Sequence, residues 1–586
     1  IWRIRSINQA SETGSWSEPA YFVTEPLPSD VPDMIVTIND TAAYQPGLTM
    51  ANLTRKAIMM ALDMYGNTVF FIAQNPTVTR NVHLAEILPN GNFLTTPYEM
   101  TLDNQIVWAP PEGIHHGIIA MPNGNFMALS RTEVMGPIPD GPWTADFDSA
   151  GIDSIPWKGD VLYEWDHDGN EIWTWSVFDH FNMLDYDSTA FALAFAAGSF
   201  DWTHSNALYY DPVESAVYIS VRQLSRITKI DYATGAVVWN MGEAMPSGDV
   251  QVGNDLGFSW QHAIEMLDNR NLILYDNGNT NSPPVSRGIE IALTETDSIP
   301  TAELVWEYVL PDSLYTRSQG DCDRLANGNS LITAANPTNP IYNGHIIEVN
   351  TVTNDIIWQL RFGANGTRSM YASERIPGLY AKAYSVIQPD LATGFTTPTI
   401  FREEGNSYLK FYIFNEGFMP ETYTYSIIDS YGWFSGSGEV TLAAEDSASI
   451  IITGNVDYDI YPDIVQITVT PAGAPAREVQ YQYDVYSTPN TATEDNFLPA
   501  SYKFDAAYPN PFNPITNLQY ATPAVSHIRL TIYDISGREV AVLVNEEQPA
   551  GIHNITWNAS QSASGIYFAR LQADGFTAKQ KIILLK

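Results

Sequence analysis

A short phrase recurs along this chain: an alternating apolar run, a turn rich in Pro, Asn and Gly, and a second apolar run. Its clearest copies are VHLAEILPNGNFL from Val82, HHGIIAMPNGNFMAL from His115, QHAIEMLDNRNLIL from Gln261 and GDCDRLANGNSLI from Gly320, with looser copies from Thr203 and Tyr371. A repeated unit of a few short strands predicts a β-propeller, because each small sheet can bury its faces only against its neighbours. We expect about six blades, with the early strands from Lys56 closing the circle beside the strand after Tyr371.

One column of the aligned repeat defines a ring. Aligned on the turn, the column holds His83, His116, His204, His262, Gly320 and Tyr371. The innermost strand of each propeller blade starts at the central channel. The four imidazoles of the column are therefore predicted to face one space, which is the best candidate for an active site.

Composition and charge exclude several classes of function. The formal net charge of −39 argues against nucleic acid or an anionic membrane as a partner. No apolar run approaches the ~20 residues of a membrane helix, so no transmembrane segment is predicted. The single cysteine, Cys322, excludes internal disulfides and is interpreted as inert core. The chain starts at Ile1 without a signal peptide, which we interpret as a fragment of a longer precursor.

Changes of pattern divide the chain into five segments. Two alternating strands in residues 1–26 resemble the last strands of a fibronectin type III domain, and the repeat occupies residues 27–380. Short alternating strands in residues 381–486 predict an immunoglobulin-like β-sandwich that acts as a spacer. Residues 487–501 form a polar linker, and residues 502–586 a second small sandwich. The predicted fold class is all-β, a six-bladed propeller followed by two immunoglobulin-like sandwiches.

The last segment carries specific motifs. They are AYPNPFNPITNLQY from Ala507, IRLTIYDISGREVAVL from Ile528, SGIYFARL from Ser564 and the basic tail that ends at Lys586. Together they resemble the type A C-terminal sorting domain of the type IX secretion system. The resemblance implies that the secretion machinery carries the protein across the outer membrane of a Gram-negative bacterium, to the cell surface or the medium. It also implies that the tail is removed, so we expect the mature form to end before Tyr502.

The repeat region carries a second set of motifs. They are LTMANLTRKAIMMALDMYGNTVFF from Leu48, DWTHSN from Asp201, WQH from Trp260, YDNGN from Tyr275, SRG from Ser286 and ERIP from Glu374. Over residues 47–380 the chain resembles bacterial aryl-sulfate sulfotransferases. These enzymes move a sulfuryl group from one phenol to another through a transient sulfo-histidine, without a nucleotide donor. The resemblance thus implies aryl sulfates and phenols as substrates, and no cofactor.

Site residues follow from the resemblance and from the ring. The family pattern implies that His204 and His262 bind the sulfuryl oxygens, with Asn206 and Arg287 assisting. Sulfuryl transfer through histidine needs a neutral imidazole nucleophile and cationic donors on the oxygens, and an arginine fork suits paired oxygens. The predicted catalytic residues are His204, His262 and Arg287, and the predicted substrate-binding residues are Asn206, His116, Asn277, Arg222, Arg317 and Tyr371.

The sequence departs from the family at the nucleophile. The family's nucleophilic histidine follows the Trp-Glu-Tyr of a later repeat, but the stretch WEYVLPDSLYTRSQGDCDRL from Trp306 contains no histidine. His345, on an outer strand of the same repeat, is interpreted as a packing or surface residue. Whether the protein is an enzyme is left open by this departure.

Two other functions fit a ring of imidazoles. The first is a metal site, since neutral imidazole is a common metal ligand and Glu86, Glu265 and Asp321 lie close to the ring in sequence. The second is a binding propeller without catalysis. The segment DHDGNE from Asp166, with Asp168 and Glu171, also mimics a calcium loop, although a hairpin turn explains Asp-Gly better.

Overall fold

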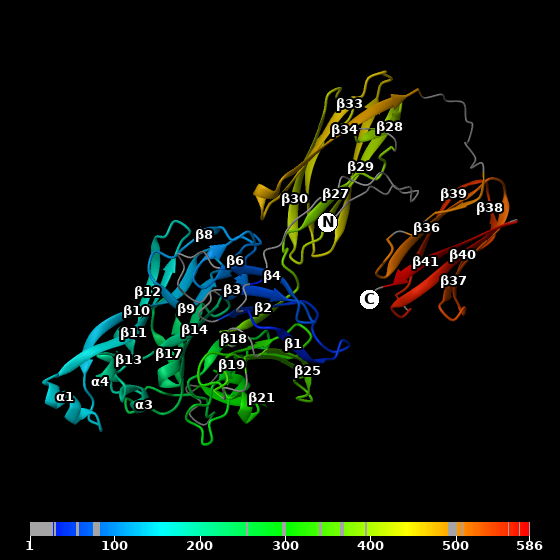
Figure 1. The fold of residues 1–586 in the computed structure, drawn as a ribbon. Helices are drawn as coiled ribbons and strands as arrows, with labels where there is room; N and C mark the ends of the chain where they lie inside the picture. Colours follow the sequence, from blue (N-terminus) through cyan, green and yellow to red (C-terminus); the bar gives the residue numbers. More distant parts are fainter. Residues whose placement is uncertain are drawn as a thin grey trace. The chain divides into compact units, whose positions relative to one another are not determined.

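The computed structural model describes residues 27, 31–53, 58–73, 83–252, 256–295, 300–338, 343–363, 369–392, 395, 397–489, 501–505, 507, 509–560, 562–573 and 575–584. The predicted fibronectin-like segment and most of the predicted linker lie outside these residues. The chain forms two compact units (Figure 1). Among the described residues, the first unit comprises those within 27–383 and 416–420, and the second comprises those within 384–415 and 421–584.

In the described part of the first unit, six antiparallel sheets of four or five strands follow one another. The first sheet consists of β2 (Leu48–Leu53), β3 (Ile58–Leu62) and β4 (Thr68–Ala73) with β26 (Ser373–Ile376), and the second of β5 (Leu84–Ile87), β6 (Phe93–Thr95), β7 (Glu99–Met100) and β8 (Ile106–Trp108). The third sheet consists of β9 (Ile114–Ala120), β10 (Phe126–Pro137), β11 (Ser154–Trp165) and β12 (Glu171–Ser176), and β13 (Phe200–Asp201) pairs parallel with β11. The other three are β14 (Ser205–Asp211), β15 (Ala216–Val221), β16 (Arg226–Asp231) and β17 (Val237–Gly242); β18 (His262–Met266), β19 (Leu272–Asp276), β20 (Arg287–Thr294) and β21 (Thr301–Val309); and β22 (Asp321–Arg324), β23 (Ser330–Ala334), β24 (His345–Val349) and β25 (Ile356–Phe362) with β1 (Met34–Asn39).

The first and last strands of this unit share sheets. Strand β26 pairs antiparallel with β2, where Ser373 lies opposite Ala51, and β1 pairs with β25, where Asn39 lies opposite Trp358. The sequence predicts the first of these pairings, between early strands and the strand after Tyr371. The second pairing covers the outer edge of the β22–β25 sheet and was not predicted. Both pairings remove open sheet edges.

The repeated turn has a structural role that the motif alone did not reveal. Its glycine adopts a positive φ, 81° at Gly91 and 86° at Gly124, which L side chains rarely adopt. Its two asparagines donate their amides to one buried carboxylate on the third strand of the same sheet: Asn90 and Asn92 to Glu99, Asn123 and Asn125 to Glu164, Asn269 and Asn271 to Glu290, and Asn327 and Asn329 to Glu348. A buried carboxylate is tolerated only when it is hydrogen-bonded, so turn and third strand stabilise each other.

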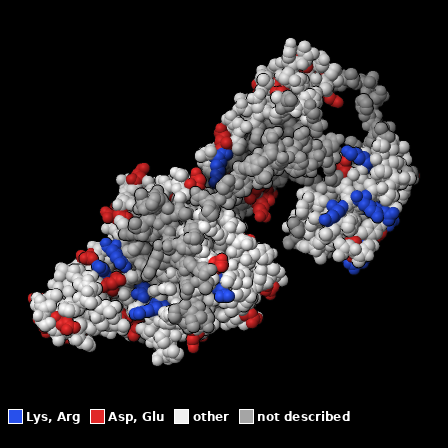
Figure 2. Space-filling model, in the orientation of Figure 1, with Lys and Arg blue, Asp and Glu red and all other residues white. Residues whose placement is uncertain are grey.

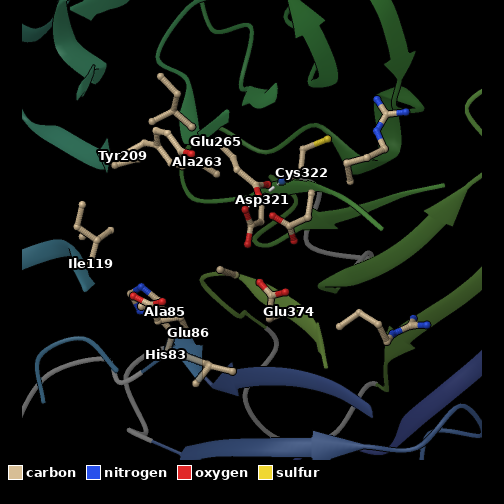
Figure 3. Close-up of a pocket in the computed structure, with 18 of the residues that line it drawn as sticks. His83, Ala85, Glu86, Ile119, Tyr209, Ala263, Glu265, Asp321, Cys322 and Glu374 are labelled. Atoms are coloured by element: carbon tan, nitrogen blue, oxygen red, sulfur yellow. Dashed lines mark hydrogen bonds between the residues drawn. The ribbon is translucent and has the colours of Figure 1, made fainter. Parts of the chain in front are cut away.

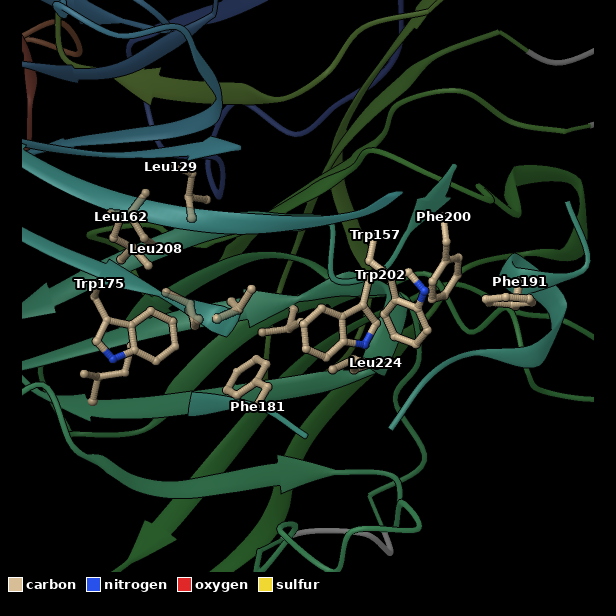
Figure 4. Close-up of a cluster of buried hydrophobic side chains, with 14 of the residues drawn as sticks. Leu129, Trp157, Leu162, Trp175, Phe181, Phe191, Phe200, Trp202, Leu208 and Leu224 are labelled. Atoms are coloured by element: carbon tan, nitrogen blue, oxygen red, sulfur yellow. The ribbon is translucent and has the colours of Figure 1, made fainter. Parts of the chain in front are cut away.

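The largest buried apolar cluster supports the β9–β12 and β14–β17 sheets (Figure 4). The ring of Trp157 contacts the rings of Trp202 and Phe200 edge-on, with centroids 5.4 and 4.8 Å away. The indole nitrogen of Trp202 donates to the Asp185 carbonyl at 2.7 Å. Short helices cover this cluster: α1 (Thr144–Ala150), α2 (Val177–His180), α3 (Ser188–Phe191) and α4 (Ala194–Ala197). Trp202 thereby anchors the strand that leads into His204.

The second unit contains two separate pairs of sheets. The first pair is β27 (Tyr384–Ile387), β29 (Gly405–Asn415) and β32 (Ser447–Val456) against β28 (Thr399–Glu403), β34 (Val479–Thr488), β33 (Asp463–Pro471), β30 (Glu421–Asp429) and β31 (Gly436–Leu442). The second pair is β35 (Lys503–Phe504), β36 (Ile515–Thr522) and β39 (Gly551–Asn558) against β38 (Glu539–Gln548), β37 (Ser526–Asp534), β40 (Gly565–Ala573) and β41 (Phe576–Leu584). Each pair encloses its own apolar core. The predicted all-β class is confirmed.

The formal net charge of −39 is carried by acidic side chains, which on the face drawn in Figure 2 are dispersed over the described surface. Among the described residues, no helix has the length and apolar character needed to cross a membrane.

Candidate functional site

The site begins with irregular backbone near the start of β9 and β14, each the first strand of its sheet. The pairing of β9 with β10 and of β14 with β15 shifts register near the first residues of β9 and β14. His116 and His204, at these positions, have positive φ values of 59° and 47°. A bulge redirects side chains, and a strained backbone in a folded protein often accompanies function. The local geometry therefore turns both imidazoles away from ordinary strand directions.

These imidazoles line a cavity of about 860 Å³, here called the histidine cavity. It is lined by His83, Thr96, Pro97, Gly113, Ile114, His115, His116, Arg131, His204, Arg222, His262, Ser318, Gln319 and Tyr371. The structure thus brings together five of the six residues of the aligned column, and Arg222 with them. The predicted site residues Asn206, Asn277, Arg287 and Arg317 are not among the lining residues.

His262 is held at both ring nitrogens. Its Nδ1 lies 2.6 Å from the side-chain oxygen of Asn277, whose amide group donates to the carbonyls of Thr316 and Gln319. Its Nε2 accepts the backbone N–H of Gln319 at 3.1 Å. Burial, and then the nearby Arg222 charge, lower the pKa of His262 to about 3. The ring is therefore neutral, and it would have to give up a partner to bind anything else.

His116 is the end of a chain of polar groups. Its Nδ1 lies 2.6 Å from Nδ1 of His115. The Nε2–H of His115 points at the carbonyl of Ser130, 3.1 Å away, and Asp160 Oδ1 lies 3.0 Å from the same nitrogen, off the N–H direction. Asp160 is 1% exposed and its Oδ2 accepts from Thr203 Oγ1. Burial, and then nearby cations and imidazoles, lower the pKa of His116 well below its ordinary value.

His204 stands between opposite charges. Its Nδ1 lies 2.5 Å from Asp201 Oδ2 and 3.1 Å from a guanidinium nitrogen of Arg131. The hydrogen bond from His204 holds the pKa of Asp201 at about 2 against the effect of burial. Asp201 is therefore ionised. Nδ1 of His204 carries a proton, and the carboxylate of Asp201 accepts the hydrogen bond from it.

Two further groups complete the walls. The ring of His83 stacks on Tyr371 with centroids 4.6 Å apart, and burial lowers the pKa of His83 to about 4. Arg222 lies over the Trp260 ring, 4.1 Å from its centroid. Burial lowers the pKa of Arg222 to about 10, so the guanidinium stays charged at neutral pH. The cavity thus combines neutral imidazoles with a desolvated cation.

The other predicted site residues have different surroundings. Asn277 is buried and holds His262, and Arg317 lies near the Trp260 ring. Asn206 donates to the Gln261 carbonyl at 2.7 Å. Arg287 binds Asp276 and Glu307 on the neighbouring strands, at 2.8 and 2.9 Å. Its fork is therefore already occupied by carboxylates rather than directed into the histidine cavity.

A second cavity, of about 530 Å³, shares only His83 and Tyr371 with the first. Figure 3 shows Glu265, Asp321 and Glu374 around this space. Burial, and then neighbouring carboxylates, raise the pKa of Asp321 to about 7 and that of Glu374 to about 8. Among the described residues, no group of three His, Cys, Asp or Glu side chains is arranged to hold a metal ion.

Asp166, His345 and Cys322, which were considered from the sequence for metal binding or catalysis, have contacts that suit a role in the fold. Asp166 accepts from the backbone N–H groups of Asp168 and Asn170 and so closes the β11–β12 hairpin. His345 is buried and donates to the Asn343 carbonyl. Cys322 is 1% exposed, and burial raises the pKa of its thiol well above the ordinary value.

Sequence reasoning missed several lining or supporting residues. Thr96, Arg131 and Gln319 line the cavity, and Asp160 supports it from β11. None belongs to the aligned column, because each reaches the site from another strand or loop. The only available signal was the doubled histidine of HHGIIA, in which His115 precedes the column.

Sequence comparisons define the class. The family profile described as Arylsulfotransferase (ASST) matches residues 44–372, and that of the Secretion system C-terminal sorting domain matches residues 506–585. The first unit with its histidine cavity is thus an arylsulfotransferase domain, followed by a sorting domain. The chain belongs to the arylsulfotransferase family, and its sorting domain indicates export through the type IX system to the cell surface or the medium. Both resemblances predicted from the sequence are confirmed.

Comparison with curated proteins finds no match. Solved structures with some likeness include PorZ, a bacterial surface component of the type IX secretion system of Porphyromonas gingivalis, with 11% identity, 91% of this chain and 68% of that chain covered and a TM-score of 0.23. Dimeric latent PorU of the same organism has 12% identity, 64% and 32% coverage and a TM-score of 0.18. The Pseudomonas aeruginosa CupB2 chaperone has 10% identity, 32% and 98% coverage and a TM-score of 0.13. Likeness at this level carries no argument about fold or function.

Proposed function

We propose that the six sheets of the first unit are the blades of a β-propeller and that the histidine cavity lies in its channel. Two observations support this. The first strands of successive sheets are in contact, β9 with β14 and β14 with β18. The shared sheets formed by β26 with β2 and by β1 with β25 join the two ends of the unit. The two sheet pairs of the second unit are proposed to be immunoglobulin-like sandwiches.

The proposed function is nucleotide-independent transfer of a sulfuryl group from an aryl sulfate to a phenol. The observation that carries the proposal is the cavity itself, within the region that matches the family. It places imidazoles whose pKa values are lowered, His116 and His262, beside the charged Arg222. Neutral imidazole is the nucleophilic form, and a desolvated guanidinium stabilises the charge that develops on sulfuryl oxygens.

The side chains that line the cavity have separate roles in this reaction. Arg222 binds the sulfuryl oxygens, and Arg131, which also lines the cavity, provides further N–H groups. The stacked pair of His83 and Tyr371 offers a flat wall for an aromatic ring. A cavity of about 860 Å³ has room for a phenol beside the sulfuryl group. An imidazole takes the sulfuryl group from the donor and passes it to the acceptor.

The second candidate is a secreted propeller that binds aryl sulfates without turning them over. It is favoured by the stretch from Trp306, which lacks the family's nucleophilic histidine, and by His262, whose two nitrogens already have partners. Both candidates use the same cavity. They differ only in whether an imidazole forms a bond to sulfur.

Turnover separates the candidates. The full chain is mixed with 4-nitrophenyl sulfate and a range of phenol concentrations, without nucleotide, in buffer that contains a chelator. The proposed function predicts that phenol accelerates release of nitrophenol and that the chelator has no effect. Binding of 4-nitrophenyl sulfate without release supports the binding propeller. Loss of binding after chelation, with recovery on adding a divalent metal, contradicts both and supports a metal on the histidine ring.

A further inference from the structure

We propose that His116 is the nucleophile of this chain, with its Nε2 taking the sulfuryl group, and that His115 and Asp160 are positioning residues for it. The inference rests on the proposed sulfuryl transfer and names the residue that carries it out. It also explains how the chain can act without a histidine in the stretch from Trp306.

Hydrogen bonding determines which nitrogen of His116 is available. Nε2 of His115 has two acceptors around it, the Ser130 carbonyl at 3.1 Å and Asp160 Oδ1 at 3.0 Å, so this nitrogen carries the proton. In neutral His115, Nδ1 is then an acceptor. The contact of 2.6 Å from His116 Nδ1 therefore uses the Nδ1–H of His116. The lone pair of His116 is left on Nε2, to which no described residue bonds.

The backbone holds this arrangement in place. The φ of 59° at His116 and the bulge in β9 place two adjacent imidazoles at right angles, with centroids 4.9 Å apart. The carbonyl of His116 accepts from Thr96 Oγ1 at 2.8 Å, which fixes the peptide orientation. A nucleophile held at a defined angle loses little entropy in reaching its reactive geometry.

The other imidazoles of the cavity are less suited to this role. His262 has partners at both nitrogens. Nε2 of His83 donates to Thr96 Oγ1, because that hydroxyl gives its own proton to the His116 carbonyl, and Nδ1 of His83 is buried. His204 is the nearest competitor, since its Nδ1–H also points to a carboxylate.

Charge distinguishes His116 from His204. An imidazole that bonds to sulfur gains positive charge. Asp160 is 1% exposed, so its negative charge acts on the His115–His116 pair with little screening by solvent. His204 has a guanidinium nitrogen of Arg131 at 3.1 Å from its ring, and Asp201 is about one-third exposed. The adjacent guanidinium disfavours positive charge on His204. Burial and neighbouring groups lower the pKa of His116 well below its ordinary value, so the His116 ring is neutral, which is the nucleophilic form, before the reaction.

The reaction balances without a cofactor. The Nε2 lone pair forms the N–S bond while the S–O bond to the aryl group breaks, and the electron pair leaves on a phenolate, which water protonates. The Nδ1 proton of the sulfo-imidazole can move toward His115, which shares the charge with Asp160. In the second step the acceptor oxygen attacks sulfur, the N–S bond breaks, the electron pair returns to Nε2, and the phenolic proton goes to water.

The test is to locate the intermediate in the full chain. The protein is mixed with 4-nitrophenyl sulfate without acceptor, quenched in alkali, digested and mapped by mass spectrometry. We expect a burst of nitrophenol equal to the protein concentration and an added SO₃ on the peptide that contains His116. An SO₃ on His204 or another residue would overturn the inference and leave the proposed function intact. If neither a burst nor acceptor-dependent turnover occurs, the proposed function itself has failed, and the inference with it.

Variants provide an independent readout. His116→Gly suits the positive φ and should lower kcat by ~10² or more, as removal of a nucleophile does, with activity partly restored by added imidazole. His167→Gly, at a half-exposed histidine outside the cavity, is the matched control. Asp160→Asn removes the buried charge and should lower kcat by ~10² with KM nearly unchanged. If the role of His116 is only structural, added imidazole will not restore activity to His116→Gly. If Asp160→Asn is as active as the wild type, Asp160 has no part in positioning the nucleophile.

Discussion

Nδ1 of His115 and Nδ1 of His116 lie 2.6 Å apart, although adjacent residues of a strand ordinarily point to opposite faces of the sheet. The bulge in β9 and the left-handed backbone of His116 make the contact possible. The doubled histidine is thus a joined pair that connects the buried Asp160 to the cavity.

Arg222→Met should lower kcat/KM for 4-nitrophenyl sulfate by ~10²–10³. The reason is that the variant keeps the packing on Trp260 but removes the desolvated positive charge from the cavity. Steady-state kinetics with saturating phenol measure the effect. Arg538→Met, on the exposed Arg538 of the sorting domain, is the control. An Arg222→Met protein with wild-type kcat/KM would exclude this guanidinium from the reaction.

His204→Ala and His262→Ala should differ in their effects on stability. We expect both to lower kcat by ~10² or more, since both alter the cavity. His262→Ala should lower the free energy of unfolding by about 1–3 kcal/mol, because it leaves the Asn277 oxygen and the Gln319 N–H without their partner. His204→Ala should cost less, because the carboxylate of Asp201 that loses its partner is about one-third exposed and can bind water instead. Urea unfolding beside kinetics measures both. Equal loss of stability in the two variants would contradict the hydrogen-bond assignment of His262.

Asp321→Asn should stabilise the protein above neutral pH. The folded-state pKa of Asp321 is raised to about 7, so the folded state binds a proton that the unfolded state releases near pH 4. The Asp321 contribution to stability is therefore lost as pH rises from about 4 to 7. We expect the variant to have a Tm a few degrees higher than wild type at pH 8 and a similar Tm at pH 4. A lower Tm of Asp321→Asn at pH 8 would show that the carboxylate has a stabilising partner there.

Trp202→Ala should destabilise the first unit by about 3–5 kcal/mol, the usual cost of truncating a fully buried aromatic side chain. It removes the ring contact to Trp157 and the hydrogen bond to the Asp185 carbonyl. Chemical denaturation of the purified protein measures the loss. Trp433→Ala, in the separate core of the second unit, is the control and should leave the transition of the first unit in place.

The secreted protein is predicted to end before Tyr502. The region matched by the sorting-domain profile, residues 506–585, would then be absent from the mature form. Intact-mass analysis of material collected from the medium or the cell surface measures the C-terminus. Mature protein that retains Lys586 would contradict removal of the tail, while its presence outside the cell would still agree with export.

The sequence repeat identified residues that line one cavity, because a fixed turn places the same strand position at the same place in each repeated sheet. This is why His83, His116, His204, His262 and Tyr371 meet in one cavity. The repeat could not give the neighbours of each ring. Whether a nitrogen meets a carboxylate, a carbonyl or a backbone N–H depends on contacts between strands that are far apart in sequence.

Arg287 illustrates this limit. It begins β20 and lies near His262 along the chain, so the sequence allowed it to reach the same space. In the structure, Asp276 lies opposite it on β19, and the guanidinium binds Asp276 and Glu307 instead. Arg131, which no motif marked, lies beside His204. Proximity in sequence gives neither the direction of a long side chain nor the carboxylates that compete for it.

The pattern of initial rates is the most direct test of a sulfo-histidine mechanism in this protein. Rates of nitrophenol release are measured over a matrix of 4-nitrophenyl sulfate and phenol concentrations, with nucleotide and metal left out. A covalent intermediate predicts parallel lines in double-reciprocal plots, because the donor phenol leaves before the acceptor binds. Intersecting lines would show direct transfer in a ternary complex and contradict the mechanism, and the absence of phenol-dependent release would contradict the enzyme function itself.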